Sequence, residues 1–152
     1  MKTEYIGLRK FTYRDNLSDK WIIDEVSHPS TYQKWLQINK NDCVLDIGMN
    51  IGAFSIFYGS KAKKCIGFEP EENNYKLAVL NIKQNNFRNE MIPIHSAVMG
   101  SDIKEVVLYV NSGSRRDGDT IIEVRGRTKV VVRVDNINDI IKQHKPNKLK
   151  LD

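Results

Sequence analysis

The 152-residue sequence contains few of the residues that build disulfide frameworks or metal centres. Its two cysteines, Cys43 and Cys65, each lie inside a short apolar run, and its three histidines are far apart along the chain. This pattern is typical of small buried side chains in a reduced compartment, so it predicts neither a disulfide nor a metal site. We therefore expect a cytoplasmic protein.

Long apolar runs are also absent, and the N-terminus is polar and charged from Lys2 onwards. The sequence therefore predicts neither a signal peptide nor a membrane span. The formal charge of +5 arises from 24 basic and 19 acidic residues that are spread along the chain. The densest basic stretches, 61–64 and 142–150, lack the interleaved aromatic residues of a nucleic-acid groove. Their composition argues against a nucleic-acid partner and favours solvated surface lysines.

The length and composition are those of one globular domain with a buried core. Apolar residues make up 40% and charged residues 28% of the sequence, which is ordinary for such a domain. No internal repeat, low-complexity segment or interdomain linker interrupts the chain. We expect residues 1–152 to form a single domain, in which residues 1–27 are an irregular to extended N-terminal extension that could fold as a small hairpin.

The strongest local pattern lies between residues 42 and 70. An apolar run at 43–45 is too short for a helix and is typical of a strand buried on both faces. The sequence DIGMNIG at 46–52 indicates a sharp turn, and the residues at 53–58 predict a helix after it. A second apolar run at 65–68 predicts another strand. The order is strand, glycine turn, helix and strand.

The polar and small residues around this turn each have a chemical reason. Gly48 permits a backbone conformation, or a close approach of a ligand, that a side chain would obstruct. Gly52 allows the following helix to pack closely. Free N–H groups in the first turn of that helix suit an anionic group. Glu69 follows Gly48 by about twenty residues, the spacing at which nucleotide-binding folds place a carboxylate beside ribose hydroxyls.

The pattern is not the dinucleotide fingerprint G-x-G-x-x-G, because Asn50 and Ala53 occupy the second and third glycine positions. The D-x-G-x-N-x-G at 46–52 instead resembles the first motif of class I S-adenosylmethionine (SAM) methyltransferases. Together with GFEP at 67–70, it resembles the FkbM-type methyltransferase family. The resemblance covers roughly residues 24–152 and implies an α/β fold, a Rossmann-like sheet with helices on both faces.

The resemblance also implies SAM as the cofactor, no metal, and a set of residues that would hold SAM. Those that would hold its methionine end are Asp46, Gly48, Asn50 and Gly52. Those that would take the ribose hydroxyls and border the adenine are Glu69, Pro70, Ser96 and Ala97. Asp152 is the candidate for a catalytic group near the transferred methyl.

Further patterns predict the elements that surround this centre. Ser30 and Gln33 form a capping box before an amphipathic helix that ends near residue 39, with Tyr32 packed in the core or bordering the SAM pocket. The apolar spacing after Pro70 predicts a second helix, which ends before residue 85. Pro93 places the strand at 91–96 at an edge of the sheet, because proline cannot donate to a ladder.

The C-terminal third contains an inserted β-hairpin region. Its predicted strands are 105–110 and 129–134, with a further short strand at 120–124. Residues 111–119 form a polar loop, interpreted as a surface loop or as a flap near the substrate. A helix then follows, capped at residue 135 or 136 and ending before Pro146, and a last strand begins at residue 148.

The leading interpretation is a SAM-dependent methyltransferase that acts on a hydroxyl group of a small molecule or sugar. Two alternatives stay open: a nucleic-acid methyltransferase, and a catalytically silent SAM-binding or interaction module. The KLD at 150–152 matches the K-x-D of the family's fourth strand, so the resemblance extends over the N-terminal half of the family's domain. We expect the isolated chain to bind SAM without methyl transfer and to self-associate through its exposed C-terminal strand.

Overall fold

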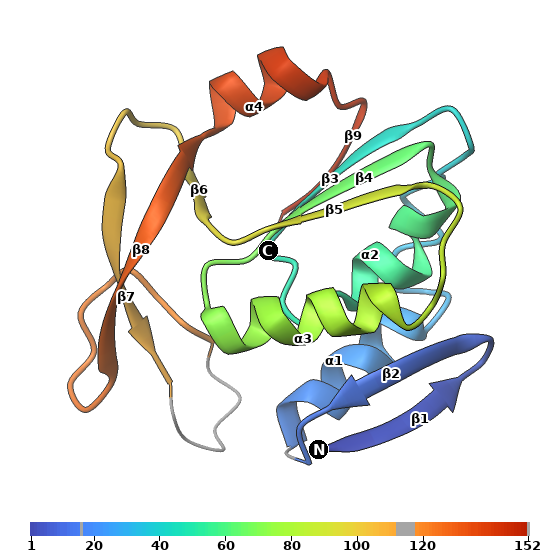
Figure 1. Ribbon diagram of the computed structural model, residues 1–152, viewed down its shortest axis with the longest axis horizontal. Helices are drawn as coiled ribbons and strands as arrows, with labels where there is room; N and C mark the ends of the chain where they lie inside the picture. The colour runs from blue at the N-terminus through green and yellow to red at the C-terminus, as the bar shows by residue number, and fades with distance from the viewer. Residues whose placement is uncertain (16, 112–117, 152) are drawn as a thin grey trace.

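The structure is a computed structural model that describes residues 1–15, 17–111 and 118–151. Its central sheet is parallel, with the strand order β5-β4-β3-β9 (Figure 1). These strands are β3 (Cys43–Ile47), β4 (Lys64–Phe68), β5 (Glu90–Ile94) and β9 (Lys148–Leu151). If these four strands are numbered by their order in the chain, their order across the sheet is 3-2-1-4, which is part of the strand order of a doubly wound sheet. The expected α/β fold is confirmed.

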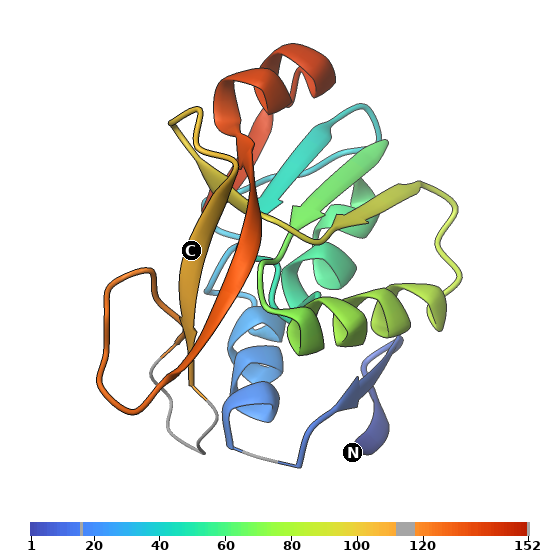
Figure 2. The same cartoon turned by 60° about the vertical axis from the view of Figure 1, so that its left-hand side comes forward.

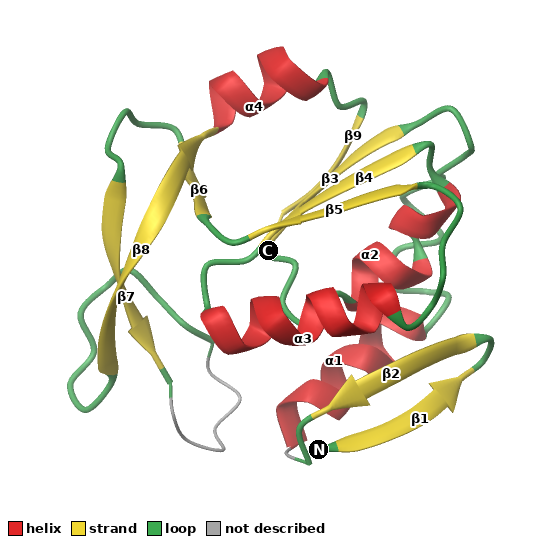
Figure 3. Cartoon of the chain, in the orientation of Figure 1, coloured by secondary structure: helices red, strands yellow, loops and turns green. Residues whose placement is uncertain are grey.

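Helices cover both faces of the parallel sheet, as Figure 3 shows. They are α2 (Ala53–Phe57) and α3 (Glu72–Lys83) on one face and α4 (Ile137–His144) on the other. Val44 packs in the core on the α2 side, whereas its neighbour Leu45 packs with Ile140 of α4. Successive strand residues point to opposite faces, so a short continuous apolar run is buried on both.

The N-terminal region is a hairpin followed by a helix. β1 (Lys2–Ile6) and β2 (Arg9–Tyr13) pair antiparallel, as expected, but α1 (Leu17–Ser27) replaces the expected irregular chain. The expected helix at 30–39 is wrong, because residues 28–35 form bends and turns. These turns place the ring of Tyr32 against two aromatic rings, Phe54 and Tyr58, with centroids 5.0 and 5.6 Å away.

A smaller sheet stands beside the parallel one (Figure 2). It consists of β6 (Ala97–Met99), β8 (Thr128–Asn136) and β7 (Glu105–Val110), in that order across the sheet. The inserted β region is thus present, although its expected strand at 120–124 is reduced to one bridge between Thr120 and Tyr109. β8 leads directly into α4, whose first turn is capped by the side chain of Asn136.

The strand order of the parallel sheet bears on the expected positions of its first and last strands. β5 lies at one end of the strand order, as Pro93 predicted. β9 pairs with β3, so the order of the strands reverses between these two. Asp152 and most of the 111–119 loop, including Arg115 and Arg116, lie outside the described residues. Among the helices that the structure describes, none has the length and apolar character to cross a membrane.

Candidate cofactor-binding site

The chain forms a tight coil, residues 48–52, between the carboxyl end of β3 and the start of α2. Gly48, Asn50 and Gly52 have positive φ angles of 76°, 52° and 86°. Glycine adopts this left-handed conformation without strain, and asparagine tolerates it better than most residues do. The Oδ1 of Asn50 also accepts a hydrogen bond from the N–H of Ile51, at 2.7 Å. The alternation of left-handed residues explains why the sequence has glycine or asparagine at these positions.

The N–H groups of this coil already have acceptors within the protein. Gly48 and Met49 donate to the carbonyl oxygen of Phe68, at 3.1 and 2.8 Å, and Gly52 donates to Met49. Asn50 donates to a carboxylate described below, and the N–H of the remaining residue is bound to the Asn50 side chain. Residues 48–52 therefore have no N–H group that lacks an acceptor within the protein. An anionic group would therefore have to bind at the first turn of α2, and this helix is only five residues long.

Glu69 is a buried carboxylate at the carboxyl end of β4, with 5% of its surface exposed. Its Oε2 accepts a hydrogen bond from the N–H of Asn50, at 2.8 Å, and its Oε1 accepts one from the N–H of Glu71, at 2.9 Å. The carboxylate thus bridges the coil and the start of α3. Burial raises the pKa of Glu69 to about 7, against the lowering effect of the two N–H donors and of a hydrogen bond from the Asn74 side chain. A carboxylate has about four acceptor sites, so Glu69 retains acceptor capacity for a ligand hydroxyl.

Asp46 lies beneath the coil and has no exposed surface. Its Oδ2 accepts a hydrogen bond from Ser55 Oγ at 2.7 Å, and its Oδ1 lies 3.1 Å from Lys150 Nζ. Lys150, which comes from β9 and is also buried, donates to the carbonyl oxygen of Gly48 at 2.7 Å. The structure therefore places Asp46 where it holds the coil in shape, with Lys150 as a partner that the sequence analysis did not identify.

The residues expected beside an adenine lie at two adjoining segments. The carbonyl oxygen of Pro70 is 3.0 Å from His95 Nε2, so the end of β4 and the end of β5 are in contact. Ser96 is 1% exposed, and its hydroxyl donates to Asp135 Oδ2 at 2.7 Å. Ala97 begins β6 and is half-buried. The hydroxyl of Ser96 is thus committed to the end of β8, while the backbone of this segment adjoins Pro70.

Two further carboxylates border the site, and neither was identified from the sequence. Glu71 caps α3 by accepting a hydrogen bond from the N–H of Asn74, at 2.7 Å. Asp119, from the insertion between β7 and β8, interacts electrostatically with both Glu69 and Glu71, and burial raises the pKa of Asp119. Within the described residues, no group of three or more His, Cys, Asp and Glu side chains has a metal-binding arrangement.

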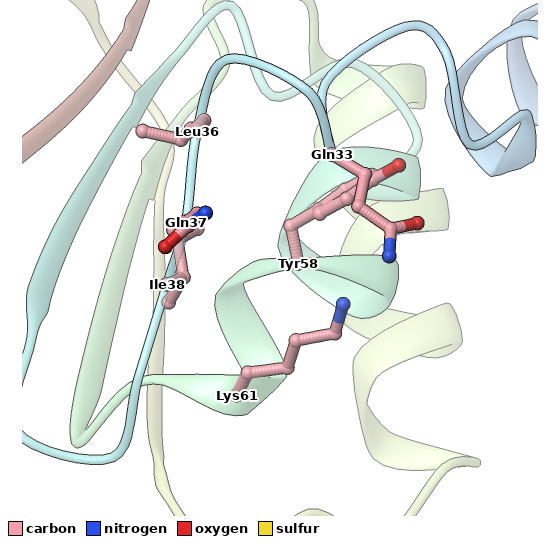
Figure 4. A pocket seen from close by; sticks show the side chains of 6 residues that line it. All are labelled: Gln33, Leu36, Gln37, Ile38, Tyr58 and Lys61. Atoms are coloured by element: carbon pink, nitrogen blue, oxygen red, sulfur yellow. The ribbon is translucent and has the colours of Figure 1, made fainter.

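A pocket of about 300 Å³ lies elsewhere on the molecule (Figure 4). It is lined by Gln33, Leu36, Gln37, Ile38, Tyr58 and Lys61. These residues come from the segment before β3 and from the end of α2 onwards, so they lie towards the amino ends of the parallel strands. Ligands of open α/β sheets bind outside the carboxyl ends of the strands, so this pocket is not the cofactor site.

Comparisons with known proteins find sequence similarity over part of the chain. No family model matches the chain. A 23S rRNA (uracil(1939)-C(5))-methyltransferase from Aliivibrio salmonicida is 40% identical over 55 residues, which are 36% of this chain and 13% of that protein. An uncharacterized RNA methyltransferase from Nanoarchaeum equitans is 36% identical over 67 residues, 43% of this chain and 15% of that protein. The chain is similar in sequence to methyltransferases.

Solved structures of methyltransferases show partial likeness. An FkbM methyltransferase from Methylobacillus flagellatus is 18% identical, over 82% of this chain and 32% of that one, with a TM-score of 0.41. A tRNA m1G37 methyltransferase from M. jannaschii is 28% identical, over 42% of this chain and 24% of that one, with a TM-score of 0.37. The FkbM type stays a prediction.

Proposed function

We propose that this chain forms the cofactor-binding part of a SAM-dependent methyltransferase. The observation that carries the proposal is the buried carboxylate of Glu69, held by the N–H groups of Asn50 and Glu71. It stands at the carboxyl end of a parallel strand, next to the left-handed coil, where nucleotide-binding sheets accept a ribose. The sequence similarity to methyltransferases supports SAM over other nucleosides.

Each residue of the site has a role in this proposal. Glu69 accepts hydrogen bonding from the ribose through the acceptor capacity that its carboxylate retains. The coil lies along the methionine end, and its shape is maintained from below by Asp46 and Lys150. The adenine is bordered by Pro70, Ser96 and Ala97. When bound, SAM supplies an electrophilic methyl group on a sulfonium.

Transfer of that methyl is a displacement, so alignment of the acceptor supplies much of the rate. A base is needed only to take the proton of a hydroxyl acceptor. The strand order reverses between β3 and β9, and ligands of such sheets bind outside the carboxyl ends of the strands at this point, which supports an acceptor site there. Asp152, which follows β9 and lies outside the described residues, remains the proposed group near the methyl.

The first proposal for the acceptor is a hydroxyl group of a small molecule or sugar. RNA is the second, because the curated relatives named above are RNA methyltransferases. That similarity weakens the expectation, drawn from the scattered lysines, that nucleic acid is not a partner. A third possibility of another class is a silent module that binds SAM without transferring its methyl.

Calorimetric titration of the wild-type chain tests the identity of the cofactor. We expect SAM and S-adenosylhomocysteine to bind, and NAD to bind much more weakly, because the coil departs from the dinucleotide fingerprint at Asn50 and Ala53. Binding of NAD at an affinity equal to that of SAM would refute the assignment, as would the absence of SAM binding.

Transfer of a radioactive methyl from SAM tests the acceptor. Total RNA and a panel of sugars and small hydroxylated compounds are incubated separately with the chain and labelled SAM. Label in the hydroxylated compounds supports the first proposal, and label in RNA replaces it with the second. SAM binding with no label in either pool agrees with the expectation that this chain alone binds SAM without transferring its methyl.

A further inference from the structure

α3 and the two residues that follow it present a row of amide side chains, Asn81, Gln84 and Asn85, to the N-terminal hairpin. Asn85 Nδ2 donates to the carbonyl oxygen of Lys10 at 2.7 Å, and Asn85 Oδ1 accepts from the N–H of Lys10 at 2.8 Å. Gln84 Nε2 also donates to that carbonyl oxygen, at 3.0 Å. These amide side chains therefore satisfy backbone groups of β2 that would otherwise lack partners at the edge of a two-stranded sheet.

One member of this row also reaches the coil. Asn81 has no exposed surface, and its Oδ1 accepts a hydrogen bond from the N–H of Thr12 at 2.8 Å. Its Nδ2 donates to the carbonyl oxygen of Ile51, in the middle of the coil, at 3.0 Å. A primary amide combines a donor and an acceptor in one rigid group, which this double contact requires. A single side chain thus connects the hairpin with the coil.

We propose that Asn81 is a positioning residue of the cofactor site, and that the N-terminal hairpin influences cofactor binding through it. This inference rests on the proposed role of the coil in binding SAM. Glu69 holds the coil at the N–H of Asn50, and Asn81 holds it at the carbonyl oxygen of Ile51. The Met49–Asn50 and Ile51–Gly52 peptide groups are therefore held by side chains from two different parts of the chain.

A second link joins the N-terminal region to the start of α3. The guanidinium of Arg14 binds both Asp19 Oδ1, at 2.7 Å, and Asn74 Oδ1, at 2.6 Å. Asn74 in turn donates its N–H to Glu71, whose own N–H is bound by Glu69. Residues 1–27, expected to be an extension, are thus connected by hydrogen bonds to both sides of the candidate site.

Loss of the Asn81 amide leaves two buried backbone groups, Thr12 N–H and Ile51 C=O, without their partners. An unsatisfied buried group is costly, so the coil and the hairpin shift to regain partners. The coil is sensitive to such a shift because its left-handed residues, Asn50 and Gly52, flank Ile51 directly. A displaced coil no longer presents the N–H of Asn50 to Glu69 in the same position.

The test compares Asn81→Ala with Asn85→Ala as a matched control. Both variants remove an amide that binds β2, but only Asn81 contacts the coil. SAM affinity is measured by calorimetry, and amide hydrogen exchange is followed at residues 48–52, at a temperature where melting curves show both variants folded. We expect Asn81→Ala to weaken SAM binding about tenfold or more and to speed exchange at Asn50 and Ile51. Asn85→Ala should change the affinity less than about twofold.

Equal weakening in both variants, or unchanged affinity and exchange in Asn81→Ala, would overturn the inference. If the wild-type chain does not bind SAM, the proposed function fails, whereas the exchange rates of the coil still decide the role of Asn81. Should Asn81→Ala not fold, Asn81→Ser retains a hydroxyl for one of the two partners. The same two measurements on Asn81→Ser then decide.

Discussion

Glu69 owes its proposed role to the combination of burial and hydrogen bonding. Its two oxygens accept from N–H groups on either side of the site, which fixes the orientation of the carboxylate. Burial disfavours the charged form and places the pKa at about 7, and the nearby charge of Asp119 acts in the same direction. The group therefore changes its charge close to neutral pH, and hydroxyl donors bind to the ionised form.

The first prediction at this scale is that SAM affinity depends on pH. With a pKa of about 7, Glu69 is mostly ionised at high pH and mostly protonated at low pH. Because the ribose hydroxyls prefer the carboxylate, affinity should fall by about tenfold from pH about 8 to pH about 6. Glu69→Gln, which cannot ionise, should bind more weakly and lose this dependence. A wild-type affinity that stays constant over this range would argue against Glu69 as the ribose ligand.

The second prediction at this scale concerns Lys150. Lys150→Met removes the cation beside Asp46 and leaves a buried charge without its ion pair. We expect a loss of about 3–5 kcal/mol in the free energy of unfolding, measured by urea denaturation. Lys148→Met, two residues earlier on β9, is the control and should change stability by less than about 1 kcal/mol. Similar losses in both variants would show that Lys150 has no special role under the coil.

At the scale of elements, local patterns predicted the four strands of the parallel sheet, β7, β8 and the helices α2, α3 and α4, because short apolar runs and caps depend on neighbouring residues. The helix expected from the Ser30 capping box is absent because long-range contacts prevail. Ser30 Oγ bonds His28 Nδ1 at 2.7 Å, and Tyr32 packs against rings of α2 and the residue after it. The unrecognised helix α1 has its signal in the spacing of the buried residues Ile23 and Val26.

In the candidate site, too, features set by neighbouring residues were predictable and features set by long-range contacts were not. The identities of the coil residues are dictated by their own backbone angles, so the D-x-G-x-N-x-G spacing made the coil predictable. Asn81 and Lys150 contact the coil across 30 and 102 positions of the sequence. Nothing in their immediate neighbourhood indicates those partners, so only the folded chain reveals them.

A prediction at this scale concerns the packing of the coil on β4. A Cβ at Gly67 would lie 2.3 Å from Met49 Sδ and 3.1 Å from Met49 Cγ, and Met49 is itself buried. Gly67→Ala should therefore destabilise the protein by about 1–3 kcal/mol and weaken SAM binding as Met49 moves the coil. Gly100→Ala is the control, since its Cβ would meet no atom within 4 Å. Thermal melts and SAM titrations of both variants check this, and an unchanged Gly67→Ala would contradict it.

At the scale of the whole molecule, the described residues place no strand beyond β9 in the parallel sheet. Leu149 and Leu151 of this strand are 53% and 67% exposed. An open edge with apolar side chains is a template for pairing with another chain. On its inner side, β9 is paired with β3 from Lys148 to Leu151.

We therefore predict that the isolated chain self-associates in a concentration-dependent manner, which sedimentation velocity measures. Leu151→Lys places a charge on the exposed edge and should reduce association, because edge lysines discourage strand pairing. Leu8→Lys is the control, since Leu8 is 94% exposed in the turn between β1 and β2, away from this edge. A wild-type chain that remains monomeric at every concentration would refute this prediction.

The central claim, that Glu69 and the coil form a SAM site, is tested most directly by calorimetric titration of SAM into three proteins. These are the wild type, Glu69→Ala, and Glu72→Ala as a control with the same substitution at an exposed glutamate that pairs with Lys76. Because Glu69→Ala loses a charge-assisted hydrogen bond, its affinity for SAM should be about tenfold or more lower. Glu72→Ala should bind SAM as the wild type does. Equal SAM affinity in a folded Glu69→Ala variant and the wild type would contradict the account.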